Sequence, residues 1–249
     1  MNEITEIKTQ RKIVKIYKKY IVLISTLIID SDYVFDIIFY KKLFDLIDDM
    51  YSKINITINT EMTLNIKRNY NLLYDITETK PIKIDITKIL KNPNTKHTIN
   101  FELNRNKRKL KNTLKRYIEQ SIKMNKSLDD INKYIKNKVY NKVYGKTKGD
   151  GYKTLRIFRT EYTRTRTEAK LKAIENLRKE GYKITRNWLY TYESKVPRPS
   201  HLSSNGITDD GNGYFIIDGY KTKGPGLFGI ASEDINCRCD TECYCETVR

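Results

Sequence analysis

Apolar side chains recur every three or four positions along the first part of the chain. The pattern is carried by Ile13, Tyr17, Leu23, Leu27, Phe39, Leu43 and Ile47. Because this spacing matches the period of a helix, residues 1 to about 75 are predicted to form helices. Ser31-Asp32 separates two apolar runs and is expected to break the helix there. Since isoleucine is β-branched, the same region could instead include strands.

A connector is predicted between residues 76 and 104. Proline and asparagine mark loops on both sides of a short apolar piece, Ile82 to Leu90. Proline also disfavours helix in the residue before it. His97 lies in this connector with no cysteine or second histidine near it, so we expect a surface histidine without a special role.

The region from residue 105 to 148 is the most basic part of the chain. Seven cations fall within twelve positions: Arg105, Lys107, Arg108, Lys109, Lys111, Lys115 and Arg116. Leu110, Leu114 and Ile118 follow helical spacing beneath them, and Ser127 is a candidate cap for a second helix. The resulting positive stripe could lie along the phosphates of DNA. The alternative is a solvated lysine-rich face.

Residues 152 to 180 are predicted to form one long helix, preceded by a glycine hinge from Gly145 to Gly151. The hinge lacks the glycine and lysine spacing of a nucleotide phosphate loop. Arg159-Thr160-Glu161 is repeated seven residues later as Arg166-Thr167-Glu168. Seven residues are two helical turns, so both tripeptides are expected to point the same way.

The last quarter of the chain differs in kind from the rest. It holds all four cysteines, the only tryptophan and one of the two histidines, among many glycines and prolines. Residues 183–192 and 214–218 are β-branched and aromatic, which predicts short strands. The predicted fold class is α+β. Helical N-terminal and middle regions would precede a small, loop-rich C-terminal α+β domain.

Two domains are expected from these patterns. Residues 1–104 would be a helical docking region with its connector. Residues 105–249 would be a second domain, with basic helices at 105–180 and a small β-containing part at 181–249.

The net charge and the length of the apolar runs limit the classes of function that the chain can have. The formal net charge is +18, which suits an anionic partner such as nucleic acid or an acidic protein surface, although a solvated lysine surface would give the same value. No secretory signal is visible, and the apolar run Tyr20–Ile29 is about half the ~20 residues that a membrane-spanning helix needs. We therefore expect a buried core helix at this run, no membrane association and synthesis in a reducing cytoplasm.

One set of residues resembles a known family. The motif residues are Arg159-Thr160-Glu161, Gly181, Trp188, Arg198-Pro199-Ser200-His201, Gly206 and Asn236-Cys237-Arg238-Cys239. In order and spacing they resemble the phage Mu F-like minor head proteins, the phage head-morphogenesis domain family. The resemblance covers roughly residues 108 to 240. The chain departs from the family pattern at Glu193, where members usually have Asp, and in its additional Cys243 and Cys245.

The resemblance implies a minor capsid protein of a tailed bacteriophage, present in few copies per particle. Its expected location is the capsid interior near the portal vertex, with assembly in the host cytoplasm. Expected partners are the portal protein, the major capsid protein and packaged double-stranded DNA. Arg159 and Arg198 would be buried organisers that pair with Glu161 or Glu193, and Trp188 would lie in the core.

A structural zinc site is the candidate chemistry of the cysteine region. Such a site takes four ligands, often thiolates and a histidine. His201, Cys237 and Cys239 supply three ligands, and Cys243 or Cys245 could supply the fourth, with Cys243 the expected one. Alternatively, His201 is a hydrogen-bonded structural histidine and the cysteines stay free. A disulfide, if formed, would join the 237–239 pair to the 243–245 pair, because adjacent Cys-x-Cys bridges are strained.

Catalysis is not expected from the sequence. Cys237 and His201 could be drawn as nucleophile and base, but no helix N-terminus is signalled there to activate a thiolate. Some family members carry toxin domains after this module, whereas this chain ends ten residues past Cys239. Two alternatives to a head protein stay open. One is a zinc-stabilised nucleic-acid-binding protein. The other is an effector enzyme ejected with the DNA, either a hydrolase or an ADP-ribosyltransferase-like protein.

Overall fold

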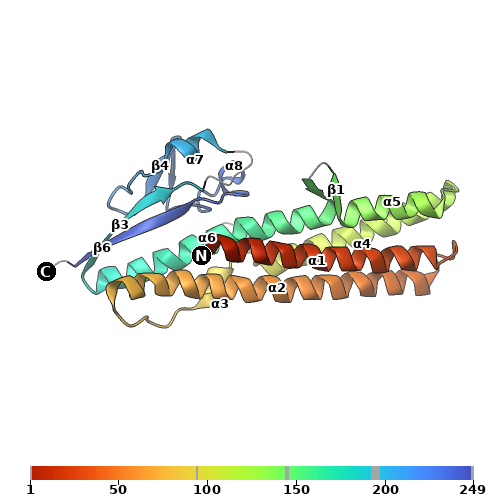
Figure 1. Cartoon of the computed structure of the whole chain (residues 1–249), viewed down its shortest axis with the longest axis horizontal. Coiled ribbons are helices and arrows are strands. Elements are labelled where there is room, and N and C mark those ends of the chain that lie inside the picture. The colour runs from red at the N-terminus through yellow and green to blue at the C-terminus, as the bar shows by residue number, and fades with distance from the viewer. Residues whose placement is uncertain (1, 94, 144–145, 192–196, 248–249) are drawn as a thin grey trace. The chain divides into compact units, whose positions relative to one another are not determined.

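The chain forms two compact units, and each is built from two separate stretches of sequence. A computed structural model describes residues 2–93, 95–143, 146–191 and 197–247. Unit 1 comprises residues 1–60 and 98–156, and unit 2 comprises residues 61–97 and 157–249. The predicted fold class is confirmed, since long helices precede a small C-terminal α+β part (Figure 1). The domain boundary expected at residue 104 falls inside helix α4 (Ile99–Lys123), and each unit combines segments from both sides of it.

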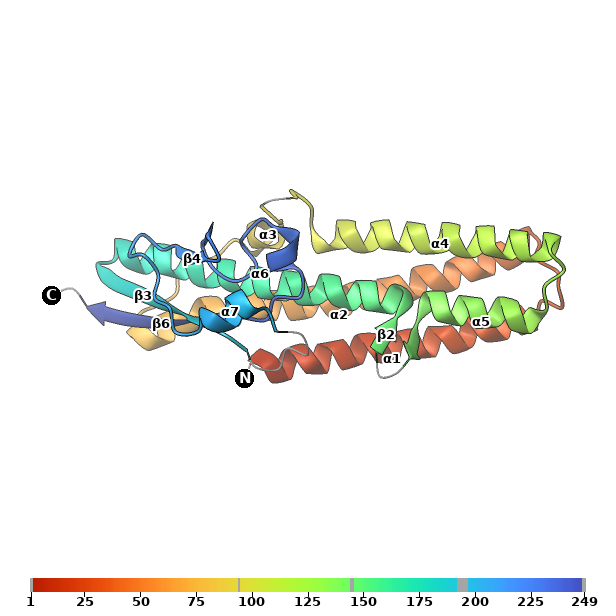
Figure 2. The same cartoon turned by 90° about the horizontal axis from the view of Figure 1, so that it is seen from above.

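Unit 1 consists mainly of helices that lie side by side (Figures 1 and 2). They are α1 (Asn2–Ile29), the first part of α2 (Ile37–Thr77), α4, α5 (Leu128–Val139) and the start of α6 (Gly149–Lys179). Strands β1 (Asn141–Val143) and β2 (Lys146–Lys148) form a short antiparallel pair. Residues 31 and 32 lie between α1 and α2, where a helix break was expected, and the Ile-rich region is helical rather than stranded. Ser127 caps α5 by accepting a hydrogen bond from the amide of Asp130 at 3.1 Å.

The core of unit 1 is mainly apolar and rich in tyrosine. Buried positions on its helices are Ile13, Tyr17, Tyr20, Ile24, Ile28, Leu43, Ile47, Ile54, Leu114, Ile118, Ile131 and Ile135. Each fully buried side chain of this kind stabilises the fold by roughly 1.5–3 kcal/mol. The run Tyr20–Ile29 is helical but buries only one face, because Val22 is 62% exposed and Ile29 is 55% exposed. Among the described helices, none has a stretch apolar and long enough to cross a membrane.

One carboxylate lies inside this apolar unit. Asp150 Oδ2 accepts hydrogen bonds from Tyr17 Oη at 2.7 Å and Tyr51 Oη at 2.5 Å, and Tyr17 also contacts Thr154 Oγ1. Burial raises the pKa of Asp150, although the two tyrosine hydroxyls oppose the shift. The cluster therefore joins α1, α2 and α6 through groups that water does not reach.

The predicted glycine hinge is a packing position where it is described. Gly149 begins α6 with a φ of +76°, and a Cβ there would lie 2.7 Å from the carbonyl oxygens of Asn137 and Lys138. A Cβ at Gly151 would lie 2.5 Å from the Tyr140 ring. These glycines let the start of α6 lie against the end of α5, so the hinge prediction is wrong for residues 149–151.

Unit 2 combines helix ends with short strands. It contains the end of α2, α3 (Ile86–Leu90), most of α6, β3 (Tyr182–Leu189), α7 (Pro199–Ser203), β4 (Phe215–Ile217), β5 (Tyr220–Thr222), α8 (Ala231–Asp234) and β6 (Asp240–Thr247). Strands β3 and β6 pair antiparallel, with Trp188 opposite Thr241, and β4 pairs with β5. Strands were expected at β3 and β4. Strand β6 was not, because its cysteines had been interpreted only as site residues.

Two apolar clusters form the core of unit 2. The first lies between the ends of α2 and α6 and includes Tyr70, Leu73, Ala173, Leu177 and Ile184. The second comprises Trp188, Tyr190, Phe215, Ile217, Cys237 and Cys239. The only tryptophan is 1% exposed, so it is a core residue as expected.

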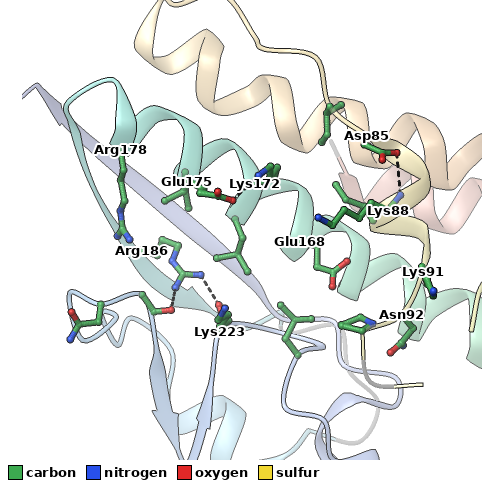
Figure 3. Close-up of a pocket in the computed structure, with 18 of the residues that line it drawn as sticks. Asp85, Lys88, Lys91, Asn92, Glu168, Lys172, Glu175, Arg178, Arg186 and Lys223 are labelled. Atoms are coloured by element: carbon green, nitrogen blue, oxygen red, sulfur yellow. Dashed lines mark hydrogen bonds and ion pairs between the residues drawn. The ribbon is translucent and has the colours of Figure 1, made fainter. Parts of the chain in front are cut away.

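Buried arginines stabilise the loops of unit 2. Arg186 occupies the inward position of β3 between Ile184 and Trp188, and its Nε lies 2.9 Å from Asp209. Its Nη1 and Nη2 donate to the carbonyl oxygens of Lys223 and Gly213 at 2.6 Å each (Figure 3). These partners compensate the cost of burying the charge.

Candidate metal centre

One face of α6 holds the Asn-Cys-Arg-Cys segment in place. Arg159 Nε donates to Asn236 Oδ1 at 3.0 Å, and the amide of Asn236 donates to Thr160 Oγ1 at 3.0 Å. Further along the helix, Thr163 Oγ1 donates to the Cys237 carbonyl at 2.6 Å. These contacts come from neighbouring turns of one helix face, so they fix the segment residue by residue.

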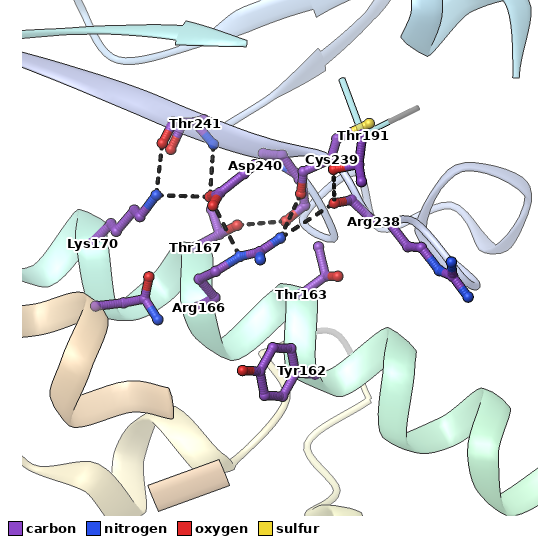
Figure 4. Close-up of polar contacts among 12 residues, drawn as sticks. Tyr162, Thr163, Arg166, Thr167, Lys170, Thr191, Arg238, Cys239, Asp240 and Thr241 are labelled. Carbon is purple, nitrogen blue, oxygen red and sulfur yellow. Dashed lines mark hydrogen bonds and ion pairs between the residues drawn. The ribbon is translucent and has the colours of Figure 1, made fainter. Parts of the chain in front are cut away.

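The same face continues beyond the cysteines. Arg166 Nη2 donates to the Cys239 carbonyl at 2.8 Å, and Lys170 Nζ lies 2.7 Å from Asp240 (Figure 4). Burial raises the pKa of Asp240, but Arg166 and Lys170 outweigh it and hold that pKa below its usual value. The segment is therefore anchored by charge at its C-terminal end.

The two Arg-Thr-Glu tripeptides point the same way, as their spacing predicts. Arg159 and Arg166 both reach the cysteine segment. Glu161 and Glu168 both accept from Arg164, at 2.7 and 2.6 Å. Arg164 is the buried arginine between the repeats, and it was not anticipated from the sequence.

His201, Cys237 and Cys239 converge in the interior of unit 2. His201 Nδ1 lies 3.7 Å from Cys237 Sγ and 3.5 Å from Cys239 Sγ. The three candidate ligand atoms all lie within 4.8 Å of one another, and all three residues are buried. On the other side of the ring, His201 Nε2 lies 3.0 Å from Glu233 Oε2. The group could hold a metal ion.

Aromatic rings surround this group. Trp188 packs edge-on against His201 with ring centroids 5.5 Å apart, and Phe228 stacks on His201 at 5.4 Å. Phe215 packs against Trp188 at 5.4 Å. The rings of Trp188, Phe215 and Phe228 supply no metal ligands. The imidazole and the two thiols are therefore the groups here that could bind a metal ion.

The two thiols differ in how readily each loses its proton. The hydrogen bond between them raises the pKa of Cys237 well above its usual value, and burial adds to that shift. The same hydrogen bond lowers the pKa of Cys239. A thiolate is the metal-binding form of cysteine, so the pair already favours one ligand in that form. All four cysteines of the chain are free thiols, and the disulfide alternative is not realised.

The predicted fourth ligand lies elsewhere. Cys243 is on β6, opposite Arg186, and packs with Cys245 against the apolar cluster around Ala173 and Ile184. Strand pairing draws β6 along β3, which carries Cys243 away from His201. The structure therefore brings together three of the four expected ligands, and Glu233 joins them through the far nitrogen of the histidine.

The remaining motif residues make contacts or backbone turns next to the Asn-Cys-Arg-Cys segment and to Trp188. Gly206 has a φ of +84°, and its amide donates to the Trp188 carbonyl at 2.8 Å. Arg198 Nη2 donates to the Ile235 carbonyl at 2.6 Å, just before Asn236. Asn236 has a φ of +58°, a left-handed conformation that asparagine tolerates better than most residues.

The expected roles of the two organising arginines need correction. Arg159 and Arg198 are half-buried rather than buried, and both bond to the segment around Asn236. Glu161 accepts from Arg164 and from Asn92, and a pairing of Arg159 or Arg198 with Glu193 stays a prediction. Glu193 lies outside the described residues.

The basic stripe of α4 is partly neutralised within unit 1. Lys107 and Lys111 both pair with Asp48 of α2, at 3.1 and 2.6 Å. Arg105 pairs with Glu102, and Lys115 with Glu119. The remaining cations of the stripe are exposed without an ion pair among the described residues: Arg108, Lys109 and Arg116. Fewer cations of this stripe than expected are therefore available to bind the phosphates of DNA.

Three residues of unit 2 that make important polar contacts were missed from the sequence. Glu233 lies in the short helix α8, and no sequence motif marks it. Arg164 lies between the two Arg-Thr-Glu repeats. Its position three residues after Glu161 and four before Glu168 could have indicated that it pairs with both. Arg186 occupies an inward position in the alternation of β3, and a charge at such a position needs a buried partner.

Comparison with known proteins gives one partial match and two negative results. A protein named NAD(+)–arginine ADP-ribosyltransferase EFV, from Enterococcus faecalis, is 40% identical to this chain over 95 residues. The match covers 38% of this chain, and the chain spans 19% of that relative's length. No family model matches the chain. No solved structure matches it either.

This relative changes one expectation. The sequence predicted no catalysis, and that prediction is contradicted by a relative whose name is that of an enzyme. The prediction had depended on the scarcity of histidines and on the weak environment for a reactive thiol around Cys237. Neither observation bears on transfer from a nucleotide, a reaction that needs no cysteine nucleophile.

Proposed function

We propose that the chain is a minor head protein of a tailed bacteriophage, with a structural zinc ion at His201, Cys237 and Cys239. The observation that carries the proposal is the meeting of the motif residues at one centre. Arg159 and Thr160 on α6, Arg198 beside α7 and Asn236 contact one another or the cysteine segment directly. A motif that assembles in this way supports the resemblance to the Mu F-like proteins.

The donor set supports zinc. Two thiols and an imidazole are ligands that zinc prefers, and a carboxylate on the far imidazole nitrogen is the usual outer partner of a zinc-bound histidine. Glu233 provides that carboxylate. When bound, zinc would link α7 to the segment before β6 and stabilise the folded unit.

The proposed location is the portal vertex inside the capsid, in few copies and in contact with packaged DNA. The exposed Arg108, Lys109 and Arg116 support the DNA contact. The test is to express the chain with the head genes of its phage and purify proheads. Co-purification with the portal protein is the expected result, and proheads that lack the chain would remove the proposal. Asn236→Ala, which breaks the contact with Arg159, should reduce incorporation. Asn125→Ala, at another left-handed asparagine, in unit 1, is the control.

A second candidate function is ADP-ribosylation of arginine, and the named relative favours it. Its test is incubation of the purified, zinc-loaded chain with biotinylated NAD⁺ and a polyarginine acceptor. Label on the acceptor supports the candidate. Label that stays in NAD⁺ or appears only as free ADP-ribose counts against it.

A further inference from the structure

A cleft of about 1000 Å³ opens in unit 2, and none of its lining residues belongs to the metal centre. It lies between the α3 region, α6, the turn before β4 and the loop after β5. Its floor is apolar and includes Ile84, Ile89, Leu171, Ile174 and Leu227. Pockets that bind small molecules typically measure about 300–1,000 Å³, so this cleft has room for a large one.

The charge around the cleft is predominantly positive. Seven of its lining residues are cationic and three are acidic. The cations are Lys88, Lys91, Lys96, Lys172, Arg178, Arg186 and Lys223. Figure 3 shows that Lys88 and Lys91 come from the α3 side, Lys172 and Arg178 from α6, and Lys223 from the loop after β5. An anionic group in the cleft would therefore meet ammonium groups from separate elements.

Some of these cations already have partners within the protein. Arg186 is buried and directs its donors to Asp209 and to two carbonyl oxygens, so it holds the loops at Gly213 and Lys223 in place. Lys172 pairs with Glu175. Lys88 and Lys91 are exposed and make no ion pair within the described residues, although Asp85, which also lines the cleft, attracts the charge of Lys88.

The one half-buried acid of the cleft is also compensated. Glu168 accepts from Arg164 at 2.6 Å. Burial raises the pKa of Glu168 to about 7, although Arg164 opposes the shift. Near neutral pH this group therefore repels an anionic ligand less than an ordinary glutamate would.

We propose that the cleft binds a dinucleotide, with its pyrophosphate at the Lys88 and Lys91 side and a base on the apolar floor. The volume favours a dinucleotide over a single phosphate, and the apolar floor favours a ligand with a flat organic part over an inorganic anion. The proposal is independent of the head-protein role. ADP-ribosyl transfer from NAD⁺ would itself need an NAD⁺ site, but binding is measured without an acceptor, so a site without transfer activity is recognised.

The experiment is isothermal titration of the full chain with NAD⁺, in parallel with ADP-ribose, inorganic pyrophosphate and a short oligothymidylate. We expect one NAD⁺ per chain, competition by ADP-ribose and much weaker binding of pyrophosphate. Each lysine that meets a phosphate should contribute about tenfold, so Lys88→Gln/Lys91→Gln should weaken binding about a hundredfold. The control Lys183→Gln/Lys221→Gln removes the same charge outside the cleft and should change binding less than twofold.

Three results would overturn the proposal. They are the absence of NAD⁺ binding at millimolar concentration, equal weakening by the two double variants, and tight binding of the oligothymidylate alone. Circular dichroism of each variant checks that the helices are intact. A chain that binds NAD⁺ without labelling polyarginine would keep this inference and remove the transfer candidate, so the two failures are distinguishable.

Discussion

The two units of this chain are stabilised by different kinds of contact. Unit 1 buries isoleucine, leucine and tyrosine at helical spacing, and Asp150 is the most deeply buried of its acidic residues among those described. Unit 2 buries Arg164, Arg186 and His201, each with polar partners supplied by segments distant in sequence. A helical core tolerates changes of similar volume, whereas a polar core depends on every partner. We therefore expect single substitutions to be more damaging in unit 2.

The only tryptophan makes this comparison measurable. Trp188 lies in unit 2, so its fluorescence reports on that unit, whereas the ellipticity at 222 nm comes from helices of both units, more of whose residues lie in unit 1. Chemical unfolding followed by both signals separates the units.

The largest effect is expected from loss of the proposed metal. Cys239→Ser, or a strong zinc chelator, should destabilise unit 2 by about 5 kcal/mol or more, because zinc binding is coupled to folding. The fluorescence transition should shift to lower urea, and the ellipticity transition should shift less, because most helical residues belong to unit 1. Cys243→Ser is the matched control, since this thiol lies outside the centre. Purified protein without zinc, and with four freely titrating thiols, would contradict the prediction.

A smaller but still large effect is expected at the buried ion pair of β3. Arg186→Met leaves Asp209 buried without its partner, which should cost about 3–5 kcal/mol in the fluorescence transition. Lys183→Met changes an exposed residue of the same strand and should cost about 0.5 kcal/mol or less. Similar losses for both variants would show that Arg186 does not stabilise the loops of unit 2.

The stability of unit 1 should depend on pH through its most deeply buried carboxylate, Asp150. The folded-state pKa of Asp150 is raised, so its contribution to stability is present below the unfolded-state pKa and is lost as pH rises through the folded-state pKa. Between pH 4 and pH 8, Asp150→Asn should therefore lose less stability than the parent in the ellipticity transition. Asp129→Asn, at an exposed position, should follow the parent curve. Parallel curves for parent and Asp150→Asn would refute the assignment.

The smallest effect on stability is expected on the surface of α4. Replacing Arg108, Lys109 and Arg116 by serine should change unfolding free energy by about 0.5 kcal/mol or less per residue. If these cations meet DNA, the slope of log affinity against log salt should fall by about 0.9 for each phosphate that the variant no longer neutralises. Lys107→Ser/Lys111→Ser, whose charges already meet Asp48, should leave the slope nearly unchanged. Equal slopes for parent and triple variant would exclude this face as a DNA-binding surface.

The sequence predicted unit 1 better than unit 2 for a physical reason. Helices and caps depend on neighbours within four residues, so the spacing at Ile13 or the cap at Ser127 is visible in the sequence itself. The partner of Arg186 and the fourth member of the histidine group, Glu233, are set by loops that no local pattern determines. The motif brought His201, Cys237 and Cys239 together correctly, but Cys243 was assigned by proximity in sequence, which strand pairing overrode.

Helix α6 contributes residues to both units, and this limits the order in which the protein can fold. Tyr17 and Asp150 are 133 residues apart, and Asn176 and Tyr70 are 106 apart, so both units close over long loops. Helical proteins usually fold quickly because their contacts are local, and this chain lacks that advantage. At about 5–20 residues per second, Tyr17 of α1 is synthesised roughly 7–27 seconds before Asp150, its partner in α6. Nascent chains that stop short of α6 therefore expose the apolar faces of α1 and α2, and would need a chaperone to stay unaggregated.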